Sequence, residues 1–348
     1  MPQPKQAANL GDVARVLGVS VATVSNALSG KGRVSAGLVP RVRETATRMG
    51  YVPSPAGRAL RTGRTGVIGL VLPDIASPLF PQIAQAIESS ASTAGYGILI
   101  ADSRSDISQQ TTAMNRLIRH GVDGLIVVPR RGTRISDMQC PVAVIDSPST
   151  PGNTVSADHW QGGEAVGAHL ASLGHSKVLL IGGSPDSNVQ NDRIGGMRAG
   201  LGATVRAAAV WIEQHEAQHG QGALLGLARR AAEGFTAFAC VSDLHALRAM
   251  TELHRAGLRV PEEASVTGFD DLPWSSVIIP ALTTVRMDVP RIADIAIASL
   301  VRVIEGKAEA VAGVVPSVGM TRVPMSLVAR QTSGFAPDPT RNNHPLPE

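Results

Sequence analysis

The sequence is poor in cysteine, in aromatic residues and in long apolar segments. Its 348 residues include two cysteines, Cys140 and Cys240, which excludes a disulfide framework and a cysteine-based zinc site. No apolar run approaches the roughly 18 residues that a membrane-spanning helix needs, and the first residues lack the apolar stretch of a secretory signal. Hydrophobic residues still make up 43% of the chain, enough for a sizeable core. We therefore expect a cytoplasmic protein of about two or three domains with no membrane partner.

The net charge of +4 is unevenly distributed along the chain. Residues 1–64 hold ten lysines and arginines against two acids, whereas the remaining residues hold 22 basic and 26 acidic side chains. A basic N-terminal part on a mildly acidic remainder is typical of a phosphate-binding module attached to another domain. The alternative is a solvated basic tail, and the residue pattern decides between the two.

The first 50 residues predict a helix-turn-helix. Asn9 can cap a helix of regularly spaced apolar residues that Gly18 ends, Ser20 caps a second helix that Gly30 closes, and a third helix is predicted over residues 36–49. Two short helices joined by a glycine-containing turn form this motif, and its second helix is built to lie in the major groove of DNA. That helix presents small or hydrogen-bonding side chains: Val21, Ala22, Thr23, Ser25 and Asn26.

The string from Asp12 to Gly30, DVARVLGVSVATVSNALSG, resembles the lac-repressor/galactose-repressor (LacI/GalR) family of bacterial transcription regulators. The resemblance covers residues 9–332 and continues through motifs in the expected order: Leu72-Pro-Asp, Asp123-Gly-Leu-Ile-Val, Leu173-Gly-His, Gly268-Phe-Asp-Asp, Leu282-Thr-Thr-Val and Ser326-Leu-Val-Ala-Arg. It implies a transcription regulator, a repressor, that binds double-stranded operator DNA as a homodimer.

The resemblance also implies which side chains read DNA. Positions matching Val21, Ala22 and Asn26 read base edges; the first two can touch a thymine methyl group, and Asn26 can pair with adenine. Four further residues are predicted to contact DNA, chiefly its phosphates: Ser20, Thr23, Ser25 and Arg33.

Residues 54–64 join this domain, residues 1–53, to the remainder of the chain. Pro55 suits the first position of a short helix. In the family this segment is a hinge helix, ordered on DNA, whose leucine enters the minor groove. Leu60 and Arg58 hold the corresponding positions, and the alternative is a flexible basic linker.

Residues 65–332 alternate strand-like and helical segments, which predicts parallel α/β sheets. Strands are predicted over residues 66–73, 97–102, 124–129, 142–146, 178–182, 237–242 and 265–269. The family resemblance implies two subdomains, as in periplasmic sugar-binding proteins, with the effector between them. Their expected segments are 65–158 with 288–317 and 159–287 with 318–332, followed by a disordered tail over residues 333–348.

Polar residues at strand ends are candidate ligand contacts, because parallel sheets bind ligands beyond the carboxyl ends of their strands. Matching the family's effector-contacting positions gives Asp146, Arg193, Ser242 and Asp270, and Phe80 and Trp274 are possible wall residues. The predicted effector-binding residues are Asp74, Phe80, Asp146, Arg193, His215, Ser242 and Asp270. An arginine fork and a carboxylate suit the vicinal hydroxyls of a sugar.

One motif points to a different chemistry. His215-Glu-Ala-Gln-His219 matches the HExxH zinc-protease pattern, but Gly220 and Gly222 follow where the helix must continue, and Leu225 replaces a third histidine. We therefore predict no metal, no cofactor and no catalytic residue.

The prediction is a repressor controlled by a sugar or sugar derivative. Two alternatives stay open: control by a protein co-regulator or a non-sugar ligand, and a binding protein or enzyme without a DNA role. The second alternative requires a damaged helix-turn-helix, and the sequence shows intact caps and apolar spacing.

Overall fold

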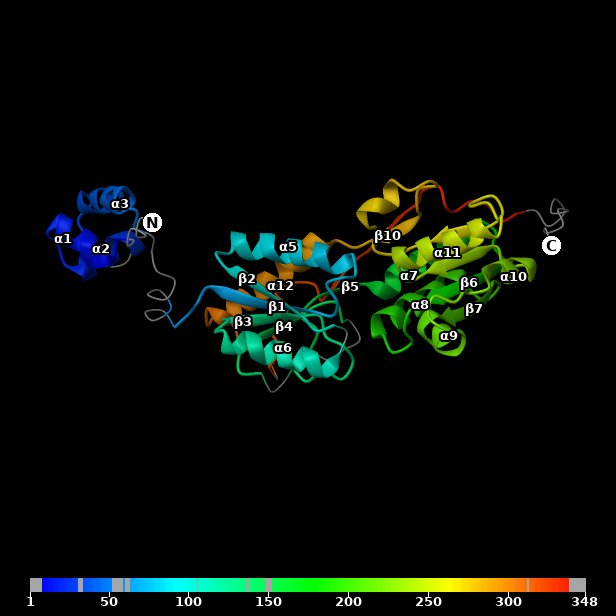
Figure 1. The fold of residues 1–348 in the computed structure, drawn as a ribbon, viewed down its shortest axis with the longest axis horizontal. Coiled ribbons are helices and arrows are strands. Elements are labelled where there is room, and N and C mark those ends of the chain that lie inside the picture. The colour runs from blue at the N-terminus through cyan, green and yellow to red at the C-terminus, as the bar shows by residue number, and fades with distance from the viewer. Residues whose placement is uncertain are drawn as a thin grey trace, which may run out of the picture. The chain divides into compact units, whose positions relative to one another are not determined.

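The computed structural model describes residues 8–30, 34–51, 59, 63–104, 106–135, 138–147, 152–311 and 313–337. The chain divides into two compact units, residues 1–66 and residues 67–348, which we call the head and the body (Figure 1). Three predicted DNA contacts, Arg33, Arg58 and Leu60, lie outside the described residues, as does most of the predicted hinge.

Three helices form the head: α1 (Leu10–Leu17), α2 (Val21–Ser29) and α3 (Leu38–Arg48). Asn9 caps α1 as predicted, because its side chain accepts a hydrogen bond from the Asp12 N–H at 3.1 Å and the Asp12 carboxylate accepts one from the Asn9 N–H at 3.0 Å. Gly18 and Gly30 end α1 and α2 in the left-handed conformation that glycine adopts without strain. The three helices share a core built on Val13, Val24 and Val42.

The third helix starts later than predicted. It begins at Leu38, and the Leu38 N–H donates to the Ser35 carbonyl in a turn at residues 36–37. No side chain caps this helix. Gly37 has low helix propensity, which explains why the helix does not extend back to residue 36.

The first sheet of the body is parallel, in the order β2-β1-β3-β4. Its strands are β1 (Val67–Leu72), β2 (Gly97–Asp102), β3 (Gly124–Val127) and β4 (Val142–Val144). Helices α5 (Leu79–Thr93) and α12 (Val289–Ile304) cover the face to which Leu70 and Leu72 point, and α6 (Ile107–Arg119) covers the face of Val71 (Figure 1). This alternation follows from the two-residue period of a strand.

The second sheet is also parallel, in the order β7-β6-β8-β9. Its strands are β6 (Lys177–Gly182), β7 (Arg206–Trp211), β8 (Ala237–Cys240) and β9 (Ser265–Thr267). Helices α7 (His159–Ser172) and α8 (Asn188–Leu201) cover one face of this sheet. Three helices follow β7 and β8 on the chain: α9 (Ile212–His219), α10 (Leu227–Ala232) and α11 (Asp243–Arg255), and the last two pack on the opposite face. The predicted parallel α/β body is therefore confirmed.

Short strand pairs join the segments that run between the sheets. β5 (Ser156–Ala157) pairs with β11 (Arg322–Val323), and β10 (Thr284–Arg286) pairs with β12 (Ser326–Val328). These pairs link residues about 40 to 170 positions apart in the sequence, so the segments between the two sheets are held together by long-range contacts.

The predicted disordered tail begins too early. Ser333 Oγ bonds to His169 Nε2 at 2.9 Å, the Gly334 carbonyl accepts a bond from His175 Nε2 at 3.1 Å, and the Ala336 N–H donates to the Leu173 carbonyl. Residues 333–336 therefore lie against the C-terminal end of α7, and residues 338–348 are outside the described part. The proline-rich, polar composition of this segment predicted disorder and did not indicate that His169 and His175 bind it.

Helices α7 and α8 meet along glycines. Gly163 and Gly167 on α7 face Gly196 and Gly200 on α8, and a Cβ added at any of the four would overlap a backbone carbonyl oxygen of the facing helix. We call this contact the glycine seam. It brings two backbones closer than side chains would permit.

Candidate functional site

Helix α2 presents an exposed edge opposite its core side. Val24 and Ala27 are buried against the other head helices, whereas Val21, Ala22 and Asn26 are exposed. The three residues predicted to read base edges thus share one accessible surface.

Ser20 acts as the helix cap that the sequence predicted. Its Oγ accepts a bond from the Thr23 N–H at 3.1 Å and lies 2.8 Å from Thr23 Oγ1. Ser25 is half-buried beside them.

A cavity of about 540 Å³ in the body gathers six of the seven predicted effector residues. Its walls come from the carboxyl ends of strands in both sheets and from the first turns of α5, α8 and α11. The predicted residues that line it are Asp74, Phe80, Asp146, Arg193, Ser242 and Asp270. We call this cavity the cleft.

The floor of the cleft is a chain of buried polar groups. Arg193 Nε donates to His159 Nδ1 at 3.2 Å, so His159 carries its proton on Nε2 and donates it to Asp146 Oδ1 at 2.7 Å. Arg193 Nη1 donates to the Val241 carbonyl at 2.6 Å and lies 2.9 Å from Asp270 Oδ1. The chain Asp146–His159–Arg193–Asp270 thus joins the end of β4 to the second sheet.

Arg193 is held from a second side by an aromatic ring. Its guanidinium lies 4.1 Å from the centroid of Phe269. The 2.9 Å ion pair with Asp270 lacks hydrogen-bond geometry, so Asp270 Oδ1 has no hydrogen-bond partner among the described residues. Arg193 therefore offsets only part of the cost of burying the Asp270 charge.

The two floor carboxyls have opposite pKa shifts. Burial alone raises the pKa of Asp146, but the charge and hydrogen bond of His159 and the charge of Arg193 outweigh it, and the net pKa is lowered. Burial raises the pKa of Asp270 to about 7, and Arg193 only partly offsets this. Asp146 is the ionised partner at neutral pH, whereas Asp270 is close to half-protonated.

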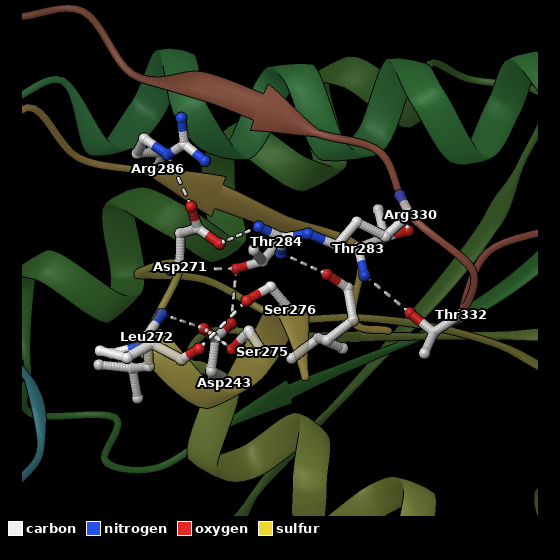
Figure 2. A network of polar contacts seen from close by, with 12 residues as sticks. Asp243, Asp271, Leu272, Ser275, Ser276, Thr283, Thr284, Arg286, Arg330 and Thr332 are labelled. Atoms are coloured by element: carbon white, nitrogen blue, oxygen red, sulfur yellow. Dashed lines mark hydrogen bonds and ion pairs between the residues drawn. The ribbon is translucent and has the colours of Figure 1, made fainter. Parts of the chain in front are cut away.

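Both carboxyls sit on unusual backbone. Asp146 has φ of 56° and Asp270 has φ of 103°, conformations that non-glycine residues rarely adopt. A network after Asp270 holds this backbone in place (Figure 2). Asp243 accepts bonds from the Leu272 N–H at 2.7 Å and from Ser275 Oγ at 2.6 Å.

Asp271 extends the same network to the C-terminal strand region. Its two carboxylate oxygens each receive one arginine, Arg286 at 2.6 Å and Arg330 at 2.6 Å (Figure 2). Burial raises the pKa of the neighbouring Asp243. The network fixes the segment that presents Asp270 to the cleft.

The sequence analysis did not identify His159 in the buried floor, nor Gln190 and His245 among the residues that line the cleft. The Gln190 side chain accepts bonds from the Gly183 and Ser184 N–H groups, which shapes the loop before α8. His245 Nδ1 is buried without a partner among the described residues, and burial, with Arg248 and Arg193, lowers the pKa of His245 to about 4. No sequence motif marks these residues; their position near strand and helix ends was the only signal.

Three predicted residues have local structural roles as well. Ser242 caps α11 by accepting the His245 N–H at 3.2 Å, and Asp74 Oδ1 accepts the Ala76 N–H at 2.9 Å. Phe80 is partly buried against the first sheet's core while lining the cleft.

His215 is not brought to the cleft. On α9, its Nε2 donates to the Leu224 carbonyl at 2.9 Å, and its ring stacks on His219 with centroids 4.2 Å apart. In-plane lone pairs of two stacked rings point in nearly parallel directions rather than toward one ion. Glu216 is paired with Arg248 at 2.7 Å. Within the described ranges, no three ligating side chains come together to hold a metal.

None of the described helices combines the length and apolar character needed to cross a bilayer.

Comparisons with known proteins match both units. Residues 9–54 match the bacterial regulatory proteins of the lacI family, and residues 168–333 match the periplasmic binding protein-like domain. The chain is 30% identical to the HTH-type transcriptional regulator DegA of Bacillus subtilis over 80% of this chain and 86% of that protein. It is 32% identical to the HTH-type transcriptional regulator MalR of Streptomyces coelicolor over 85% of this chain and 90% of that protein.

Among solved structures, the chain is similar to the lac repressor dimer bound to operator and the anti-inducer ONPF. The TM-score is 0.77 with 26% identity, covering 94% of this chain and 100% of that one. The family resemblance carried by the head and body motifs is confirmed, and the relatives are transcriptional regulators rather than enzymes. The chain belongs to the lacI family of DNA-binding transcription regulators, with a ligand-binding domain of the periplasmic-binding-protein type.

Proposed function

We propose that the protein is a cytoplasmic repressor that binds a near-palindromic operator as a homodimer and is controlled by a sugar or sugar derivative in the cleft. One observation carries the effector part. His245 Nδ1 is buried at the cleft without a hydrogen-bond partner among the described residues, and the buried Asp270 Oδ1 has the 2.9 Å ion pair with Arg193 in place of one. A buried polar group without a partner costs about 1–3 kcal/mol. A ligand that brings hydroxyl groups to both atoms removes that cost.

The DNA part of the proposal rests on α2. Its exposed edge carries Val21, Ala22 and Asn26, the residue types suited to thymine methyl groups and to adenine. Two heads related by a twofold axis would meet two half-sites of opposite orientation. Exposed Leu99 and Ile100 on the edge strand β2 supply apolar surface for a second copy. The lac repressor structure, named as a dimer bound to operator, supports the same assembly.

Control would pass through the cleft floor. The chain from Asp146 to Asp270 spans both sheets, so a ligand on Asp270 changes the contact that Arg193 makes with His159. Its effect on DNA binding equals the difference in its affinity for the two arrangements of the body. Release from the operator and tighter binding both follow from this scheme, depending on which arrangement the ligand prefers.

One observation favours a second candidate, a non-sugar ligand or a protein co-regulator. Among the residues lining the cleft, Phe80 is the one Phe, Tyr or Trp side chain, so a sugar ring finds little aromatic surface on which to stack. A binding protein or enzyme without a DNA role is disfavoured by the intact caps and core of the head.

The test is thermal unfolding of the purified protein against sugars, sugar derivatives, polyols and nucleosides. A ligand that binds only the folded state adds about 2.7 kcal/mol of stability at a hundredfold excess over its Kd. The proposal expects a shift that Arg193→Ala or Asp270→Asn abolishes and that the exposed control His120→Ala keeps. Operator binding, followed by fluorescence anisotropy, is expected to weaken in Asn26→Ala. Silence across the panel with operator binding intact would favour the protein co-regulator.

A further inference from the structure

Two consecutive arginines, Arg130 and Arg131, line the cleft beyond the carboxyl end of β3. Arg130 is half-buried and Arg131 is exposed. Neither guanidinium forms an ion pair within the part of the chain that the structure describes. Arg130 acts electrostatically on Asp106, but the Asp106 carboxylate already accepts bonds from Ser108 Oγ at 2.6 Å and the Gln109 N–H at 2.7 Å. Asp106 keeps its negative charge, so Arg130 interacts with this acid without forming an ion pair, and Arg131 has no ion pair among the described residues.

A buried glutamine fixes the turn that presents these arginines. Gln110 on α6 is fully buried, and its Nε2 donates to the Val128 carbonyl at 3.0 Å. Its Oε1 accepts the Arg130 N–H at 3.0 Å and the Thr133 hydroxyl at 2.5 Å. Because one side chain ties three points of the turn, the backbone under Arg130 is held in one arrangement.

The acids of the cleft do not neutralise this arginine pair. Asp146 and Asp270 belong to the buried floor with His159 and Arg193. Asp186 and Glu213 are exposed, but they belong to the second sheet's wall. Asp74, just after β1, also lines the first sheet's wall and is half-buried, with its Oδ1 bonded to the Ala76 N–H. The first sheet's wall thus carries both arginines and this one acid, whereas the second sheet's wall carries Asp186 and Glu213.

We propose that the effector carries an oxyanion, a phosphate or a carboxylate, held by Arg130 with help from Arg131, on a hydroxylated frame that Asp270 and His245 bind. This rests on the proposed effector role of the cleft and adds the ligand class. A guanidinium binds either oxyanion through two parallel N–H donors. The scarcity of aromatic side chains fits the same conclusion, since charge replaces stacking as the source of affinity.

Calorimetry measures the binding of matched ligand pairs to the full chain: a hexose and its 6-phosphate, a pentose and its 5-phosphate, and a hexose and its uronate. Inorganic phosphate is measured as a fragment. The charged member of at least one pair is expected to bind about tenfold or more tightly than the neutral one. Arg130→Gln is expected to remove that advantage. Arg134→Gln, in the same loop but outside the cleft lining, is expected to retain it. The phosphate and uronate arms tell the two oxyanions apart.

The acids on the second sheet's wall, Asp186 and Glu213, supply a control of opposite charge. Asp186→Asn and Glu213→Gln remove negative charge, so an anionic ligand is expected to bind as tightly or more tightly. Weaker binding in these variants would indicate a cationic ligand and overturn the inference. A neutral sugar that binds as well as its charged partner, and that depends on Asp270 but not on Arg130, would overturn the inference and leave the effector role standing. No binding in any arm, with operator binding intact, would overturn both.

Discussion

Replacing Asp270 with asparagine tests the electrostatics of the cleft floor. The pKa of this buried carboxyl is raised from its ordinary value of 3.8 to about 7, so the folded state holds a proton that the unfolded state has already lost between pH 4 and pH 7. The stabilising contribution of protonated Asp270 is complete below pH 4 and is lost as the pH rises through 7. Asparagine cannot ionise and escapes that loss.

The expected size follows from the same numbers. A tenfold change in an acid equilibrium is worth about 1.36 kcal/mol, so a pKa change from 3.8 to about 7 corresponds to at most about 4 kcal/mol at pH 8. Relative to the parent protein, Asp270→Asn is therefore expected to gain stability from pH 5 to about pH 7 and to level off towards pH 8. Any packing or hydrogen bonds that the variant loses change its stability by the same amount at pH 5 and at pH 8, because these interactions do not titrate.

The assay is urea unfolding of parent and variant at pH 5, 6, 7 and 8, with the body transition followed by circular dichroism. Asp186→Asn is the matched control, since that exposed carboxyl also faces the cleft and is expected to give a difference that does not change with pH. A stability difference for Asp270→Asn that is equally flat would refute the reasoning, because it would mean that Asp270 is ionised throughout this range.

Three further predictions concern stability and folding. His159→Ala removes the hydrogen bonds that the buried imidazole makes with the Asp146 carboxylate and with Arg193 Nε, so a loss of about 3–5 kcal/mol is expected in urea unfolding. The exposed His120→Ala is expected to cost under about 0.5 kcal/mol, and equal losses would contradict the buried chain. Gly196→Ala places a Cβ on a backbone carbonyl of α7, so it is expected to lower the free energy of unfolding by about 1–3 kcal/mol and with it the melting temperature. Gly319→Ala has open space around it and is expected to leave the melting temperature unchanged. Ser20→Ala removes the α2 cap and is expected to cost about 1 kcal/mol in head unfolding; an unchanged head transition would refute the capping role.

The head was predictable because its signals are local. Asn9, Ser20, Gly18 and Gly30 act within a few residues of their own position, so the sequence contains the whole interaction. The third helix was placed two residues early because a serine resembles a cap whether or not its backbone is extended.

The second sheet of the body was harder to predict from the sequence. Strand β7 is rich in alanine and α8 in glycine, and both compositions argue locally against the element that forms. Packing supplies the missing stabilisation, because the glycines of α8 allow its backbone to contact the backbone of α7. Helix α7 begins at His159, where the Asp158 side chain caps it by accepting a bond from the Gln161 N–H.

The cleft and floor residues also divide into those that the sequence marks locally and those that depend on distant partners. Strand-end carboxyls and Arg193 were found because chain order and family position mark them. His159 was missed because its role depends on Asp146 and Arg193, 13 and 34 residues away. His215 was assigned to the cleft by its family position, but its ring is held by the Leu224 carbonyl, a contact nine residues along the chain that the sequence pattern did not indicate.

The glycine seam has a mechanical consequence. Helices that meet through side chains can slide by changing rotamers, but α7 and α8 meet backbone against backbone and have no rotamers to exchange along these glycines. We therefore expect the two helices to move together. His159 lies in the first turn of α7 and is hydrogen-bonded to Arg193 of α8. A ligand that displaces this helix pair is therefore expected to change the contact between His159 and Asp146 at the end of β4.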